Sequence, residues 1–153
     1  MSSKKPVSVL VVIHTASLQV LLLERAANEG YWQSVTGSQE EAESLVDTAR
    51  REVREETGID APVGAFVDWH LANRFEIFPI WRARYADGVT HNVEHVFSLC
   101  VADDTCIHIT PDEHRSWHWL GWQHAVAKCF SWTNRDAIAM LPLRTRVERF
   151  TSQ

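Results

Sequence analysis

Cysteine is scarce in this sequence, and the few cysteines form no recognisable pattern. The 153 residues include three of them, Cys100, Cys106 and Cys129, an odd number with no Cys-x-x-Cys pair. A disulfide framework needs an even set, and a thiolate zinc site usually needs closely spaced pairs. The sequence therefore argues against both kinds of site, and a reducing cytoplasm fits this cysteine usage.

An excess of positive charge and long apolar runs are also lacking. The net charge is -5 with histidine neutral, whereas proteins that coat nucleic acid normally present a basic face. An anionic small molecule is not excluded, because a bound cation can reverse the local sign. No apolar stretch approaches the ~20 residues of a membrane span. The N-terminal "MSSKKPVSVLVVIH" resembles a signal peptide faintly, but a second strand-like segment follows it, so we expect a buried strand.

The chain contains no repeat, low-complexity tract or linker, so residues 1–153 are expected to form one domain. Apolar and β-branched runs predict strands at 7–13, 19–25, 31–37, 62–71, 75–85, 94–102 and 116–120. Pro79 suggests a bulge, an edge or an interruption in the fifth of these. Helices are expected over 45–57 and over 134–140, before Pro142, with weaker support near 122–129. This order predicts an α/β (α+β) fold, a mixed β-sheet flanked by helices.

The helix over 45–57 has clear start and stop signals. Ser44 can cap its first turn, with Asp47 three residues later, and Gly58 follows its end. Its apolar stripe is formed by Leu45, Val46, Ala49 and Val53.

Three glutamates of this helix lie at the border between core and solvent. Glu52 and Glu56 fall along the edge of the apolar stripe, and Glu55 fans out from them. Carboxylates placed there need compensation. Salt bridges to Arg50, Arg51 and Arg54 are one explanation, and a divalent cation with oxygen ligands is the other. The helix alone leaves both open.

The residues before the helix bear on this choice. Residues 37–59 read "GSQEEAESLVDTARREVREETGI". This segment resembles the Nudix box of the nucleoside-diphosphate-X hydrolases, with apolar Val53 and Ile59 where the box requires them. The fixed positions of the box are matched by Gly37, Glu43, Arg51, Glu52, Glu55, Glu56 and Gly58.

The resemblance implies a Nudix-type α/β/α sandwich and a Mg²⁺-dependent pyrophosphohydrolase, with Mn²⁺ as a possible substitute. Glu52 and Glu56 would bind metal and Glu55 would assist, while Arg51 and Glu43 would brace the site. Gly37 would let the chain turn tightly out of a strand. The sequence departs from the family at Ala42, where relatives very often carry glycine.

Five segments outside the box carry a second resemblance, and they read "KKPVSVLVVI", "YWQSVTGS", "FEIFPIWRARYADGVTHNVEH", "DEHRSWHWL" and "FSWTNRDAI". Together they resemble one group of Nudix enzymes, the bacterial dihydroneopterin triphosphate pyrophosphatases. The implied reaction gives dihydroneopterin monophosphate and pyrophosphate, a step of folate biosynthesis. Glu113, with Asp112 as its nearest competitor, would complete the metal site or act as base. The implied contacts to the small-molecule triphosphate are Lys4, Arg25, Thr36, Phe75, Glu76, Ile77, Phe78 and Ser131.

Other functions stay open at this point. The chain could hydrolyse another nucleotide, such as dATP or an oxidised nucleotide, or be a non-catalytic ligand sensor on the same fold. The pairs His91–His95 and His114–His118 invite a zinc interpretation, but they lack an evident carboxylate or thiolate partner in sequence. Neither nucleic acid nor membrane is expected as a partner, and the sequence leaves the oligomeric state undetermined.

Overall fold

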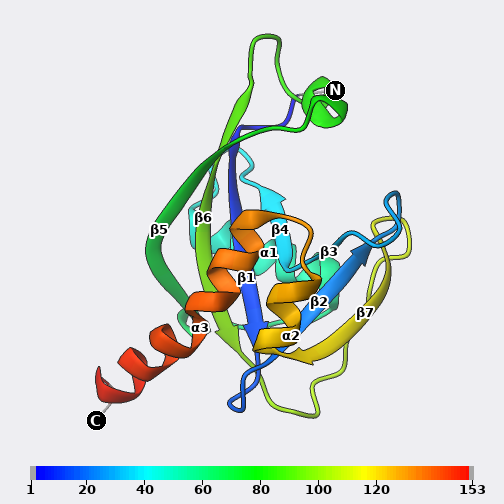
Figure 1. The fold of residues 1–153 in the computed structure, drawn as a ribbon. Coiled ribbons are helices and arrows are strands. Elements are labelled where there is room, and N and C mark those ends of the chain that lie inside the picture. Colours follow the sequence, from blue (N-terminus) through cyan, green and yellow to red (C-terminus); the bar gives the residue numbers. More distant parts are fainter. Residues whose placement is uncertain (1–2, 152–153) are drawn as a thin grey trace.

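A computed structural model describes residues 3–151 and contains a mixed sheet between two helical layers (Figure 1). The strands are β1 (Val7–His14), β2 (Gln19–Arg25), β3 (Trp32–Gln33), β4 (Val35–Ser38), β5 (Phe66–Glu76), β6 (His91–Cys100) and β7 (His114–Gly121). The helices are α1 (Leu45–Thr57), α2 (Trp122–Lys128) and α3 (Trp132–Thr151), with 3₁₀ turns η1 (Val63–Ala65) and η2 (Pro79–Arg84). Within 3–151, none of the helices has the length and apolar character that a membrane span requires.

The sheet is built around β1, which is parallel to β6 along its whole length. On its other side β1 pairs with β4 through residues 8–11 and meets β2 only at His14. β2 continues the sheet toward β3 and β7, so the sheet splits between β4 and β2. The split opens next to the loop that leads into α1.

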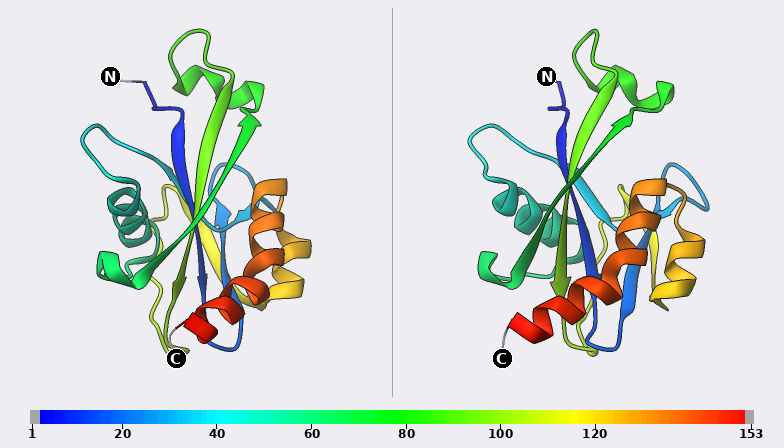
Figure 2. Two further views of the ribbon diagram at one scale, coloured as in Figure 1. Left: turned by 90° about the vertical axis from the view of Figure 1, so that its left-hand side faces the viewer. Right: turned by 60° about the vertical axis from the view of Figure 1, so that its left-hand side comes forward.

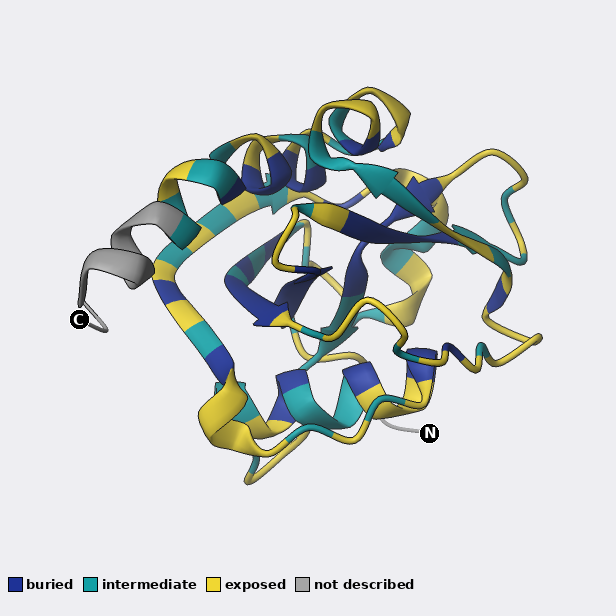
Figure 3. Ribbon diagram, turned by 90° about the horizontal axis from the view of Figure 1, so that it is seen from below, coloured by how far each residue is buried: buried dark blue, intermediate teal, exposed yellow. Residues whose placement is uncertain are grey.

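The two faces of the sheet carry separate hydrophobic cores. Alternate residues of β1 point to opposite faces. Val9 and Val11 pack with Ala49 and Val53 of α1, whereas Leu10 packs on the side that α3 covers. Figure 2 shows α1 on one side of the sheet and α2 with α3 on the other. In the residues whose burial is described, the helices bury the side that faces the sheet and expose the other (Figure 3).

The start and end of α1 confirm the sequence prediction. The Ser44 side chain accepts a hydrogen bond from the Asp47 amide at 3.2 Å. Gly58 follows in the left-handed conformation, with φ of 77°, and its amide donates to the Arg54 carbonyl. The buried side of α1 includes Glu56 as well as apolar residues. A buried carboxyl group on this helix therefore needs a separate explanation.

The strand predicted at 75–85 is wrong. β5 ends at Glu76, and the chain then forms η2, with Pro79 at its start. Proline has no amide hydrogen for a strand ladder, but its φ suits the first turn of a helix. The strand predicted at 62–71 begins at Phe66 instead, because η1 precedes it.

The end predicted for the last helix is also wrong. α3 starts at Trp132 and continues through Pro142 to Thr151. Proline inside a helix costs about 3 kcal/mol because it removes a hydrogen bond and crowds the preceding turn. Packing offsets this cost, since Ala137, Ile138 and Leu141 are fully buried against the sheet.

Candidate active site

Three side chains that could bind a metal ion meet near the split between β4 and β2. Glu56 comes from the last turn of α1, His114 is the first residue of β7, and Glu113 lies in the turn just before it. One potential ligand atom from each of the three lies within 4.8 Å of the others. Both glutamates were predicted from the sequence, whereas the sequence had pointed to His114 only as a possible zinc partner of His118.

The environment of this cluster suits a divalent cation. Glu56 is 2% exposed, and within the described residues its Oε2 and the Nδ1 of His114 have no hydrogen-bond partner. Burial, with Glu52 and Glu113 nearby, raises the pKa of Glu56 well above its usual value. Burial and the Arg25 charge lower the pKa of His114 to about 4, so its imidazole is neutral at pH 7. Carboxylate oxygens and a neutral imidazole are both metal ligands, and a cation would relieve the buried charge.

Glu52 approaches Glu56 from the same helix, and Gly37 makes room for it. A Cβ at Gly37 would lie 2.0 Å from the Glu52 Cδ and 2.2 Å from its Oε1. The glycine is therefore required by the close approach of the carboxylate; its φ is not positive, and the tight-turn explanation is wrong. Burial raises the pKa of Glu52, while Glu56 and Arg51 act in the opposite sense.

Arg51 connects the loop before α1 to the acidic cluster. Its Nε and Nη2 donate to the two carboxylate oxygens of Glu43 at 2.7 and 3.0 Å. Its Nη1 donates to Glu52 Oε1 at 2.8 Å. The hydrogen bonds from Arg51 hold the pKa of Glu43 at about 2, despite partial burial. This fork fixes the loop and the direction of the Glu52 side chain.

Glu55 differs from its neighbours on α1. Its side chain is half-exposed and lies 3.3 Å from the Arg51 Nη1. It is not one of the three residues that meet within 4.8 Å, although its charge reaches Glu56. Glu113 is also exposed, so both carboxylates are accessible to water.

Three cationic side chains lie beside the acidic cluster, those of Lys4, Arg25 and Arg84. Lys4 and Arg25 have lowered pKa values because of burial and then of Arg84 nearby, while acidic residues of the cluster act in the opposite sense on both. The backbone joins these groups, since the Lys4 amide donates to the Arg84 carbonyl at 2.8 Å and the Ala26 amide to the Glu113 carbonyl at 2.9 Å. Arg84 was missed in the sequence because it fell inside a predicted strand.

The expected pterin contacts are spread over the neighbouring surface. Ile77 is buried, and Glu76 forms an ion pair with Arg82. Phe75 is half-buried, and Thr36 lies on β4 beside Gly37 with its hydroxyl near the Gln33 amide. Ser131 accepts a hydrogen bond from the Asn134 side chain at 2.7 Å.

An exposed aromatic group lies over this region. Phe78 is 48% exposed and contacts Trp81 and Phe130 at ring distances of 5.2 and 6.4 Å. Tyr31 stacks on Phe130 at 4.7 Å. Arg25 lies 4.6 Å above the Trp81 ring, which joins the aromatic group to the cations.

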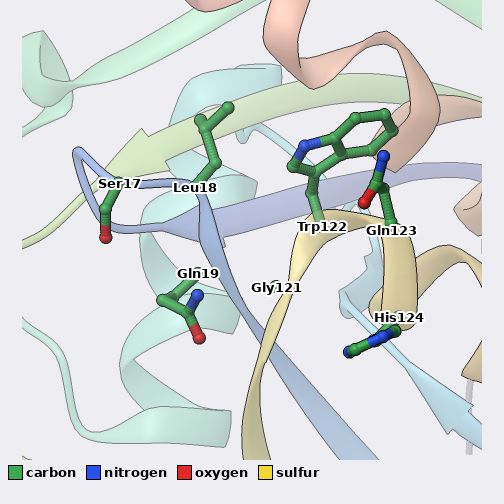
Figure 4. Close-up of a pocket in the computed structure, with 7 residues that line it drawn as sticks. All are labelled: Ser17, Leu18, Gln19, Gly121, Trp122, Gln123 and His124. Atoms are coloured by element: carbon green, nitrogen blue, oxygen red, sulfur yellow. The ribbon is translucent and has the colours of Figure 1, made fainter.

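A separate hollow lies where the β1–β2 turn meets the β7–α2 junction (Figure 4). It is lined by Ser17, Leu18, Gln19, Gly121, Trp122, Gln123 and His124. This lining contains no carboxylate and no lysine or arginine, so it does not offer the groups that a metal and a phosphate chain need.

Comparison with known proteins agrees with this arrangement. The model of the NUDIX domain matches residues 4–141. Dihydroneopterin triphosphate diphosphatase of Escherichia coli (strain K12) is 44% identical over 138 residues, 88% of this chain and 91% of that protein. The Haemophilus influenzae protein of the same name is 39% identical over 141 residues, 90% of this chain and 88% of that protein. The solved E. coli dihydroneopterin triphosphate pyrophosphohydrolase superposes with a TM-score of 0.83 at 42% identity, covering 90% of this chain and 95% of that one.

Proposed function

This chain belongs to the NUDIX domain family, and from that premise we propose that it hydrolyses dihydroneopterin triphosphate to dihydroneopterin monophosphate and pyrophosphate. The observation that supports the proposal most is the buried Glu56 carboxylate, which meets Glu113 and His114 beside Lys4 and Arg25. Few proteins bury an uncompensated carboxyl group unless a function requires it. We place this reaction in folate biosynthesis. We place the protein in the cytoplasm, because its cysteine usage fits a reducing compartment.

We further propose that Glu52, Glu56 and Glu113 hold Mg²⁺, with His114 beside them and Mn²⁺ as a possible substitute. When bound, the ion would neutralise phosphate oxygens and acidify a water molecule. Lys4, Arg25 and Arg84 would bind the remaining phosphate charge. Glu113 or Glu55, the two exposed carboxylates, would accept the proton of the attacking water. Arg51 and Glu43 would keep Glu52 in position.

Product analysis tests the proposed reaction. Purified protein with Mg²⁺ should release pyrophosphate and dihydroneopterin monophosphate from dihydroneopterin triphosphate, and a chelator should stop the release. Its kcat/KM for this substrate should exceed that for dATP. A higher value for dATP would instead assign the enzyme to deoxynucleotides, and binding without turnover would make it a ligand sensor.

The Glu56→Gln variant tests the metal site. The loss of a charged ligand should lower kcat by more than about 100-fold, since even groups that only orient metal ligands are worth roughly 10–100-fold. The fold should persist, because glutamine has the same shape and removes a buried charge that Glu52 repels. Circular dichroism and steady-state kinetics would be measured beside Glu41→Gln, which changes an exposed acid. A fully active Glu56→Gln protein would refute the assignment.

A further inference from the structure

A row of polar side chains crosses the sheet on the face that α3 covers. Ser8 of β1 pairs with Ser38 of β4 on one side and with Glu94 of β6 on the other. Glu94 in turn pairs with Asn73 of β5. Paired residues of neighbouring strands point to the same face. The next residues along these strands on that face, Leu10 and Val96, belong to the core under α3, so the polar row adjoins a hydrophobic layer.

This row leaves hydrogen-bonding capacity unused. Glu94 is 4% exposed, and the Thr133 side chain donates to its carboxylate. Within the described residues its Oε1 has no partner, and neither do Nδ2 of Asn73 and Oδ1 of Asn92. Asn92 lies two residues before Glu94 on the same face, and its Nδ2 donates to the Ser8 hydroxyl at 2.7 Å. Buried polar atoms without partners are costly and rare, so these atoms require a partner from outside the described chain.

The unused atoms lie next to the active site. Tyr85 shares a hydrogen bond with the Ser38 side chain, and its pKa is affected by both Arg84 and Glu94. Arg84 belongs to the cation group that faces the carboxylates. On the other side Thr133 follows Ser131 and Phe130, and Phe130 contacts the exposed Phe78. Glu94 thus lies between the phosphate-facing cations and the exposed aromatic group.

Resting on the proposed function, we propose that Glu94 determines the specificity of this enzyme for the pterin ring. A pterin presents in one line a carbonyl oxygen, a ring N–H and an amino group. Glu94 Oε1 accepts from the ring N–H, Asn92 Oδ1 accepts from the amino group, and Asn73 Nδ2 donates to the carbonyl. Two free acceptors and one free donor match two donors and one acceptor, and the aromatic group supplies a surface for stacking.

The electrostatics of Glu94 agree with this role. Burial raises the pKa of its carboxyl group to about 7. No lysine or arginine is among the causes of this pKa shift, so the ionised form lacks a cationic partner in the described chain. Two N–H donors of a ligand would stabilise that form.

The test combines a variant with a modified substrate. Wild type and Glu94→Gln are compared on dihydroneopterin triphosphate and on its 3-deaza analogue, which carries a C–H group in place of the ring N–H that Glu94 would accept. Wild type should lose about 100-fold in kcat/KM on the analogue, because a buried acceptor is left without its donor. On the natural substrate, the kcat/KM of Glu94→Gln should fall by a similar factor, mainly through a higher KM. Replacing the natural substrate by the analogue should then lower the kcat/KM of the variant little further. Asp103→Asn, which changes an exposed loop acid in the same chemical way, should behave as wild type.

The possible outcomes separate the inference from the proposed function. Absence of turnover of dihydroneopterin triphosphate by wild type overturns the function and the inference with it. If Glu94→Gln turns over dihydroneopterin triphosphate as well as wild type does, the inference alone is overturned. It is also overturned if the loss in kcat/KM from the variant and the loss from the analogue multiply independently, because this indicates a structural role of Glu94. If Glu94→Gln fails to fold, equal kcat/KM of wild type on the two substrates overturns it. A higher wild-type kcat/KM for GTP, whose base has the same donor and acceptor pattern, assigns the site to guanine instead.

Discussion

Several ionisable residues at this site are buried, although such groups are more stable in water. Glu56 and Glu94 are carboxyl groups under 5% exposed, and burial raises the pKa of each. His114 is buried and held neutral. Burying each of these groups lowers the free energy of unfolding of the protein without its ligands, because a buried polar group without a partner is costly. The residues that cost stability are therefore those assigned to binding.

Ala42 shows the same conflict in the backbone. It has a φ of 65°, in the left-handed region where a Cβ costs about 1–2 kcal/mol. We expect Ala42→Gly to raise the free energy of unfolding by about 1 kcal/mol, less the chain entropy that glycine adds. Urea denaturation would measure this. Ala27→Gly, in an exposed loop where φ is not positive, should be neutral or destabilising. An Ala42→Gly protein less stable than wild type would contradict the argument.

At the level of elements, α1 and the loop before it act as one unit. The loop is held by Arg51 and Glu43, and the helix by the Ser44 cap and by packing of Ala49 and Val53 on the sheet. β4 supplies the remaining surface, because Gly37 lies under the Glu52 side chain. The position of the Glu52 carboxylate thus depends on helix, loop and strand together.

A methyl group at position 37 should disturb this unit selectively. In Gly37→Ala the added Cβ occupies the space of the Glu52 carboxylate, so the side chain must leave its place. We expect kcat to fall about 100-fold, as for an ångström-scale misplacement of a catalytic group. Gly64→Ala, whose Cβ meets nothing within 4 Å, is the matched control and should keep full activity. Comparable kinetics of the two variants would show that the close approach is unimportant.

At the scale of the whole molecule, the split sheet brings distant segments to one place. Lys4, the last turn of α1 and the start of β7 meet only because β4 and β2 share one side of β1. Burial and the neighbouring carboxylates raise the pKa of Glu56, which favours its protonated form when no cation is bound. Cation binding and proton release are therefore coupled.

Metal binding should stabilise the protein more at pH 8 than at pH 6. The raised pKa of Glu56 favours the protonated form at lower pH, and a cation must displace that proton. At a Mg²⁺ concentration 100 times the dissociation constant at pH 8, the free energy of unfolding at pH 8 should rise by about 2.7 kcal/mol. The same concentration should raise it less at pH 6, and a chelator should reverse both effects. Thermal melts at both pH values would be compared with Glu56→Gln, which should respond weakly. If Mg²⁺ stabilised the variant as much as wild type at both pH values, the ion would be bound elsewhere.

Local features of the chain were predictable because they depend on neighbouring residues. The bounds of α1, its cap at Ser44 and its stop at Gly58 follow from short-range hydrogen bonds and backbone preference. The spacing of the acids in the Nudix box is likewise a local property. The strand predicted over 75–85 failed because the chain is interrupted at Pro79, which the sequence had offered as one possibility, and forms a 3₁₀ turn there. The end predicted before Pro142 failed because proline is tolerated in a packed helix.

The sequence by itself therefore determined the helix, its acidic edge and the family to which the chain belongs, because residues within a few positions of each other establish them. Only the tertiary structure decided that His114 and Arg84 join the site, that Gly37 makes room for Glu52, and that Glu94 is buried beside Asn73. These contacts join strands and loops far apart in the chain, and their geometry depends on where the sheet splits and on which face each side chain points to.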